Sequence, residues 1–149
     1  CYLFDNDASY AKALPVIWLG NLVGTVLVAA AEQLTRLAAL DERARAICEL
    51  KLSEPLLGAF LLAVFCNVMI YIAVEGYRSD PHELGKYLAL FFGVSVFILC
   101  GFEHCVANMY YFTMGGAWSA RTLGYLLVMT LGNAVGGVIG PLARRLLPR

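Results

Sequence analysis

The sequence has few charged residues. Only 15% of its 149 residues are charged, whereas 60% are hydrophobic, and the formal net charge at pH 7 is zero. Soluble domains carry about 25% charged residues, so this composition excludes an ordinary soluble domain and indicates a membrane protein. The balanced charge gives no indication of nucleic-acid or polyanion binding, and we expect no nucleic-acid partner.

Motifs for enzyme chemistry and for metal binding are also absent. The sequence contains no H-E-x-x-H, P-loop or glycine-rich dinucleotide motif, and its five cysteines include no C-x-x-C pair. Neighbouring residues on a helix point about 100° apart, so Glu103, His104 and Cys105 are poor joint metal ligands. We therefore expect no enzymatic activity, no metal and no cofactor. The cysteines, from Cys1 to Cys105, are interpreted as free buried thiols.

Apolar stretches of membrane-spanning length dominate the chain. A helix rises about 1.5 Å per residue, and the hydrocarbon core of a bilayer is about 30 Å thick. The stretches are Ala13 to Ala31, Leu56 to Val74, Tyr87 to Cys100 resuming from Cys105 to Met114, and Leu123 to Leu142. In the charged connection after the first stretch, Leu37 to Leu50 is predicted to form a short amphipathic helix at the membrane interface. The predicted fold is all-α, a polytopic helical bundle in one transmembrane domain over residues 1–149.

An internal repeat relates the first and the last of these stretches. Residues 16–26 read VIWLGNLVGTV and residues 128–138 read VMTLGNAVGGV, with seven identical positions of eleven. The two copies are three spans apart, so they run in opposite directions, as in an inverted-topology repeat. A chance match between two Gly/Val-rich helices is the alternative. If the repeat is real, roughly 60 residues with two further spans precede Cys1, and the chain is the last four spans of a six-span protein.

Each copy of the repeat has two glycines four residues apart, with an asparagine directly after the first glycine. Small residues at this spacing allow membrane helices to approach closely, and an amide inside a membrane needs a polar partner. We interpret these residues as helix-packing positions, and a role of the asparagines in the pathway described next is the alternative. The six residues are Gly20, Asn21, Gly24, Gly132, Asn133 and Gly136.

The third span is interrupted by polar residues. Glu103, His104 and Asn108 fall inside it, where a charge costs roughly 2.5–3.5 kcal/mol at the centre of a helix on insertion scales. Gly101 permits a break in the helix, and a second half-helix would then begin near Glu103 with a positive N-terminal end that attracts anions. His104 changes charge easily near neutral pH, and Asn108 lies one turn further on the same face. We therefore predict a pathway for a small acid here.

Further side chains are candidates for this pathway. Phe102 is the candidate for an apolar gate. Lys51, just before the second long span, either draws anions to the mouth of the membrane or serves as an ordinary interfacial anchor. Asn67 contacts the pathway or makes a helix–helix hydrogen bond. In the alternative interpretation of the break, Glu103 and His104 pair with each other or with the backbone and only stabilise the interruption.

The run GFEHCVANM at residues 101–109 closely resembles the fifth-helix signature of the formate/nitrite transporter family. The two Gly-Asn-x-x-Gly runs resemble the third and sixth helices of that family, Asn67 matches an asparagine of the fourth helix, and Lys51 matches a lysine in the preceding loop. The resemblance implies an aquaporin-like protomer of six helices in the lipid of a prokaryotic plasma membrane, assembled as a homopentamer. It also implies transport of small monovalent anions or their acids, such as formate or nitrite.

The resemblance also implies roles for single residues. His104 would be the central pore histidine that links transport to protons, and Phe102 would lie at a constriction. Glu103 and Asn108 would support the broken helix, Asn67 would hydrogen-bond near the histidine, and Lys51 would attract the anion. The second helix of the family, whose loop faces the histidine, has no counterpart here beyond the opening residues. A non-transporting membrane assembly subunit or an inactive fragment is therefore the alternative function.

Overall fold

The computed structural model describes residues 8–146, so Cys1 and the other terminal positions lie outside the described part. Within residues 8–146 all regular secondary structure is helical, which confirms the predicted fold class. The elements are α1 (Ala8–Gln33), the 3₁₀ helix η1 (Arg36–Leu40), α2 (Asp41–Ser53), α3 (Leu56–Ser79), α4 (Glu83–Leu99), α5 (Cys105–Met114) and α6 (Ala120–Leu146).

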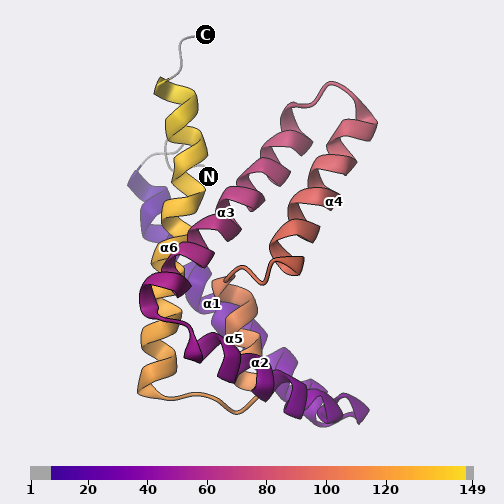
Figure 1. Cartoon of the computed structure of the whole chain (residues 1–149), viewed down its shortest axis with the longest axis vertical. Coiled ribbons are helices and arrows are strands. Elements are labelled where there is room, and N and C mark those ends of the chain that lie inside the picture. The colour runs from indigo at the N-terminus through magenta and orange to yellow at the C-terminus, as the bar shows by residue number, and fades with distance from the viewer. Residues whose placement is uncertain (1–7, 147–149) are drawn as a thin grey trace.

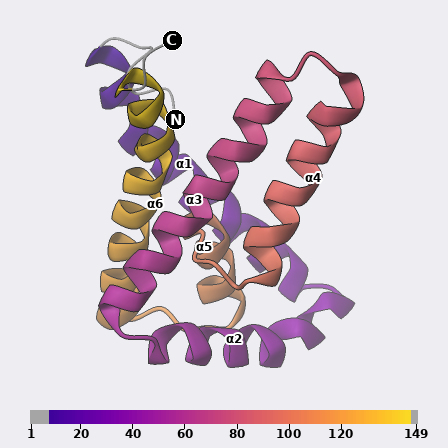
Figure 2. The same cartoon turned by 45° about the horizontal axis from the view of Figure 1, so that its top comes forward.

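Three of the described helices, α1, α3 and α6, are long and apolar enough to cross a membrane. The third predicted span is divided between α4 and α5, which descend one after the other in Figure 1. The long helices extend beyond the predicted apolar stretches because they continue into polar residues at the surface. Successive spans alternate in direction, and α1 and α6 run in opposite directions in both views (Figures 1 and 2), as the predicted inverted repeat requires.

The break between α4 and α5 begins with a glycine in the left-handed region. Gly101 has a φ of 67°, a conformation that side chains disfavour and glycine adopts readily. The Gly101 N–H donates to the Ile98 carbonyl at 3.1 Å and the Phe102 N–H donates to the Phe97 carbonyl at 3.0 Å. These two bonds form a Schellman motif, which ends α4 and turns the chain away from its axis.

Helix α3 lies at the centre of the packing, with α6 along one side and α4 along another, whereas α1 mainly contacts α5. The approach of α6 to α3 depends on glycine. A Cβ at Gly132 would lie 2.5 Å from the Phe60 carbonyl oxygen and 2.7 Å from the Ala63 Cβ, and one at Gly136 would meet the Val64 carbonyl. The close packing expected of this small-residue face is therefore present in α6.

The predicted short helix after the first span is longer than expected and has two parts. It begins as the 3₁₀ helix η1, where the Thr35 side chain accepts a hydrogen bond from the Leu37 N–H, and it continues as α2 to Ser53. Figure 2 shows α2 crossing beneath the long helices. It packs against α5 and buries Ala44 and Cys48, so α2 is held by protein on one face.

Candidate functional site

The side chain of Asn133 in α6 holds the break between α4 and α5. Its Oδ1 accepts a hydrogen bond from the Cys105 N–H at 2.9 Å, and its Nδ2 donates to the carbonyls of Glu103 and Ala63, each at 2.8 Å. Backbone groups inside a membrane have no water to bond, so an interrupted helix needs such partners. Asn67 of α3 donates to the backbone carbonyl of Asn133 at 2.6 Å. Asn67 and Asn133 thus both make helix–helix hydrogen bonds, and a contact of either residue with the pathway stays a prediction.

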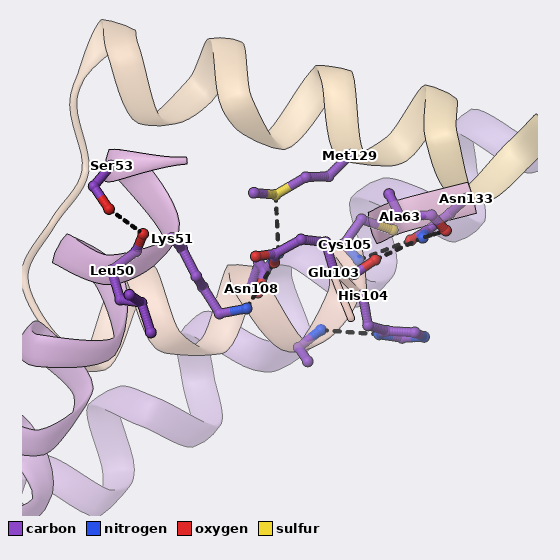
Figure 3. A network of polar contacts seen from close by, with 11 residues as sticks. Leu50, Lys51, Ser53, Ala63, Glu103, His104, Cys105, Asn108, Met129 and Asn133 are labelled. Carbon is purple, nitrogen blue, oxygen red and sulfur yellow. Dashed lines mark hydrogen bonds and ion pairs between the residues drawn. The ribbon is translucent and has the colours of Figure 1, made fainter. Parts of the chain in front are cut away.

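A buried ion pair lies directly behind the break (Figure 3). The Glu103 side chain is 3% exposed, and its Oε2 accepts from the Lys51 Nζ at 2.6 Å and from the Asn108 Nδ2 at 2.7 Å. A buried carboxylate is costly unless it is paired and hydrogen-bonded, and this one has both kinds of partner. Lys51 is 13% exposed, so the interpretation of this lysine as a surface anchor is wrong.

The side-chain amide of Asn108 is only partly hydrogen-bonded in this network. Its side chain is fully buried, and its Nδ2 also lies 2.9 Å from the Met129 Sδ. Its Oδ1 has no hydrogen-bond partner among the described residues. An unpaired buried acceptor is uncommon and marks a place where a water molecule or a further donor would be accommodated.

His104 caps the second half-helix and faces away from the ion pair. Its Nδ1 accepts a hydrogen bond from the Ala107 N–H at 3.2 Å at the start of α5. A ring that accepts at Nδ1 is neutral and carries its proton on Nε2. The ring stacks on Phe97, with centroids 6.0 Å apart, and points away from Lys51 in Figure 3. Glu103 therefore pairs with Lys51 and Asn108 and not with His104, whereas His104 bonds the backbone, as the second form of the predicted alternative has it.

A cavity of about 650 Å³ lies between α1 and α5. His104 and Ala107 line its α5 side, and Gly20, Asn21 and Gly24 line its α1 side. The structure thus brings together residues that the sequence had assigned to two separate roles, the pathway histidine and one of the two packing motifs. The wall of the cavity is mainly apolar. Entry of an ion is therefore costly unless the ion finds a polar partner there.

The other predicted pathway residues do not line this cavity. Phe102 is half-buried and packs against Phe65 of α3, with ring centroids 5.7 Å apart. The Lys51, Glu103 and Asn108 side chains lie in the network behind the break. Their contacts support α5, and the gate role of Phe102 stays a prediction.

Thr25 is a cavity residue that the sequence analysis missed. It lines the cavity on α1, and its Oγ1 donates to the backbone carbonyl of Asn21 at 2.9 Å. Comparison of the two copies of the repeat could have indicated this residue, because Thr25 stands where the second copy has Gly137. A hydroxyl at that position distinguishes the open copy of the motif from the packed one.

The cysteines follow the prediction in part. Cys48, Cys66 and Cys105 are buried free thiols, whereas Cys100 is exposed, because it is the last residue before the turn that ends α4. Cys1 lies outside the described residues. Among residues 8–146, no three His, Cys, Asp or Glu side chains are grouped in a way that could hold a metal ion.

A helix interrupted in the membrane and lining a cavity at the break is typical of transporters and channels. The family model described as formate/nitrite transporter matches residues 7–143 of the chain. The chain belongs to the formate/nitrite transporter family. Its relatives are transporters and channels and not enzymes, in agreement with the expectation from the sequence.

Two curated relatives show how far the similarity extends. A probable formate transporter of Methanothermobacter thermautotrophicus is 38% identical over 86 residues, which are 54% of this chain and 31% of that protein. The nitrite transporter NirC of Salmonella typhimurium is 31% identical over 137 residues, 85% of this chain and 50% of that protein. The chain therefore spans half or less of the length of these relatives.

Solved structures have the same fold. A pentameric formate channel with formate bound has a TM-score of 0.74 and 27% identity, over 93% of this chain and 66% of that one. An FNT family ion channel has a TM-score of 0.73 and 29% identity, over 92% of this chain and 59% of that one. The chain is thus a multi-pass membrane protein with the helical fold of these channels.

Proposed function

We propose that this chain forms part of a membrane pathway for small monovalent anions or their acids, with formate and nitrite as the candidate substrates. The observation that carries the proposal is the position of His104, at a helix break and on an open, mainly apolar cavity. The similarity to a nitrite transporter and to a formate channel supports this choice of substrates.

The chemistry of the pathway follows from the neutral imidazole. A bare anion loses its hydration in an apolar cavity, and the Nε2–H of His104 can donate a hydrogen bond to a carboxylate or nitrite oxygen. Protonation of the ring at Nδ1 would replace the acceptor of the Ala107 N–H by a donor. A proton-linked cycle through His104 therefore includes loss of this cap, a bond of about 1 kcal/mol.

The residues behind the break are assigned positioning roles. Glu103 and Asn108 support the start of α5, and Asn67 supports it through Asn133. We propose that Lys51 mainly orients Glu103. It also attracts the anion, but more weakly than an unpaired lysine would, because the carboxylate 2.6 Å away offsets its charge.

The assembly that we propose is a homopentamer in the lipid of a prokaryotic plasma membrane. The similar formate channel is pentameric. Large apolar side chains on α4, such as Phe91 at 66% and Leu99 at 85% exposed, are suited to contacts with lipid or with a neighbouring protomer.

The test is formate and nitrite flux into proteoliposomes over a range of pH, with the polypeptide that carries this sequence at its natural length. We expect His104→Asn to assemble normally, because asparagine is also a strong N-cap. The variant should lose roughly tenfold or more of the flux, the effect of one hydrogen bond to a charged group. It should also lose the pH dependence that the histidine confers.

The matched control is the other histidine of the chain. His82 is exposed in the connection between α3 and α4 and makes no side-chain cap bond, so His82→Asn should leave flux and its pH dependence unchanged. Unaltered pH dependence in His104→Asn would contradict the proton link. Absence of flux from the unmodified protein would favour the non-transporting assembly subunit.

A further inference from the structure

The cavity face of α1 continues, one turn beyond the cavity, to a carboxylate. Asn21, Thr25 and Val28 line the cavity, at the spacing of three and four residues that puts side chains on one face of a helix. Glu32 is the next position of this series, four residues after Val28. It therefore lies on the same face of α1 as the cavity residues.

A tyrosine of α5 holds this carboxylate beside the cavity. The Tyr110 hydroxyl donates a hydrogen bond to the Glu32 Oε2, and Tyr110 itself lines the cavity. The Gln33 Nε2 donates to the Met114 carbonyl at 3.3 Å, and Met114 belongs to the buried cluster against which Tyr110 packs. Helices α1 and α5 are thus in contact at this end, and a negative charge is fixed next to a cavity residue.

Glu32 differs from the carboxylates that are bound by cations. Glu75, Glu83 and Glu103 each form an ion pair with an arginine or a lysine. Within residues 8–146, no lysine, arginine or histidine forms an ion pair with Glu32. A hydroxyl donor stabilises a carboxylate but leaves its net charge in place, whereas a paired cation offsets that charge. The field of Glu32 therefore reaches the cavity without a paired opposite charge.

A cation behind the neighbouring part of the cavity wall is already engaged. Tyr111 lines the cavity next to Tyr110, and the centroids of the two rings are 5.7 Å apart. The Lys51 Nζ lies 5.9 Å from the centroid of the Tyr111 ring and 2.6 Å from the Glu103 Oε2. Lys51 is thus covered by an aromatic ring and paired with another carboxylate, so it does little to offset the charge of Glu32.

We propose that Glu32 is a specificity-determining residue, which disfavours bare anions relative to neutral solutes at this end of the His104 cavity, and that the Tyr110 hydroxyl sets the strength of this effect. The cavity wall is mainly apolar, and a charge acts more strongly in such surroundings than in water. The charge-assisted bond from Tyr110 disperses part of the negative charge. The inference rests on the proposed function in taking the cavity as the pathway, but the repulsion of an anion does not require transport.

The experiment measures how fast charged and neutral reagents reach the cavity, in the polypeptide of natural length. Ala107→Cys places a thiol on the α5 side of the cavity. This thiol is reacted at one fixed pH with anionic sulfonatoethyl methanethiosulfonate and with neutral methyl methanethiosulfonate. Protein without the added thiol gives the background, to which the exposed Cys100 contributes. The readout is the ratio of the anionic to the neutral rate, because a change in cavity width affects both rates.

The two partners of the hydrogen bond are expected to shift this ratio in opposite directions. Glu32→Gln should raise it roughly three- to tenfold, the range for loss of one partly screened charge near an apolar site. Tyr110→Phe keeps the ring and should lower the ratio, because the carboxylate then lacks its donor. Both substitutions alter the same hydrogen bond, so a purely structural role of that bond predicts changes in the same direction. The double variant should keep the high ratio, because no charge remains.

The matched control is Glu42→Gln, at an exposed carboxylate in the first turn of α2. It removes the same charge and should leave the ratio unchanged. Equal increases from Glu42→Gln and Glu32→Gln would overturn the proposal in favour of a general effect of surface charge. An unchanged ratio in Glu32→Gln, or an increase in Tyr110→Phe, would also overturn it. If Glu32→Gln does not assemble, the direction of the change in Tyr110→Phe decides.

A flux measurement in proteoliposomes connects the effect with transport. Nitrate stays ionised, whereas formate has an accessible neutral acid, so Glu32→Gln should raise the ratio of nitrate to formate flux and Glu42→Gln should not. If the unmodified protein shows no flux but the reagent ratios shift as expected, the role of Glu32 is sustained and the proposed function is contradicted. Flux together with unshifted reagent ratios would sustain the proposed function and overturn the role of Glu32.

Discussion

Helices α1 and α6 carry nearly the same run of residues, but their surroundings differ. Seven of eleven positions are identical between residues 16–26 and 128–138. In the most apolar window of each helix, 33% of α6 is buried and only 6% of α1. The glycine-asparagine motif therefore specifies a surface that can bind a helix and a break, and the neighbours available to it decide whether that surface is covered.

The buried charges lie on the same side of the molecule as the covered motif, the one in α6. Glu103 and Lys51 lie behind the break that Asn133 holds, whereas no Asp, Glu, Lys or Arg lines the cavity wall formed by α1 and α5 in the described part of the chain. The two sides of the His104 cavity thus differ in charge as well as in contacts.

The largest effect is expected from Lys51→Met. The substitution leaves the Glu103 carboxylate buried without its ionic partner, and removal of one member of a buried pair costs about 3–5 kcal/mol. Unfolding by titration with sodium dodecyl sulfate in mixed micelles measures the loss. The double variant Lys51→Met with Glu103→Gln should be more stable than Lys51→Met alone, because it leaves no lone charge.

Lys86→Met is the matched control for the loss of a lysine. Lys86 pairs with Glu83 three residues before it, and that carboxylate is 76% exposed, so the change should cost less than about 0.5 kcal/mol. Equal losses of stability from Lys51→Met and Lys86→Met would mean that the stability of the protein does not depend on the buried Lys51–Glu103 pair.

The next prediction compares the two glycine motifs directly. A Cβ at Gly136 would collide with the Val64 carbonyl, so Gly136→Ala should destabilise residues 1–149 by roughly 1–3 kcal/mol, the range for overpacking. Gly24→Ala should be neutral or slightly stabilising in the same chain, because alanine favours a helix more than glycine does. The same detergent titration measures both variants.

Two results would change the comparison. A destabilising Gly24→Ala in residues 1–149 would show that α1 is covered by something in that chain. A silent Gly136→Ala would show that the approach of α6 to α3 does not depend on this glycine.

Much of the fold was predictable because it depends on local patterns. Apolar stretches of sufficient length predicted α1, α3 and α6, and Gly101 with its polar neighbours predicted the interruption between α4 and α5. The ends of the helices were less predictable, because hydropathy marks the apolar part of a helix and α3 continues through Glu75 to Ser79.

The contacts of the site depend on residues far apart in the sequence. The Lys51–Glu103 pair joins positions 52 residues apart, and Asn133 lies 30 residues from the Glu103 carbonyl that it bonds. No periodicity encodes such partners, since they arise only when α2 and α6 pack against α5. The identities of the polar residues indicated a site, but the sequence did not reveal that His104 faces a cavity while Glu103 faces the core.

The smallest effect is expected at a side-chain hydrogen bond that joins the two copies of the repeat, from the Trp18 Nε1 to the Thr130 Oγ1 at 3.1 Å. Trp18→Phe removes the donor and keeps an aromatic ring, and Thr130→Val removes the acceptor with little change of shape. A double-mutant cycle of the two substitutions in residues 1–149, read by the same titration, should give a coupling energy of about 0.5–1.5 kcal/mol. A coupling near zero would mean that α1 is positioned by α5 alone, and the opposite orientation of the two copies would then owe nothing to direct contact between them.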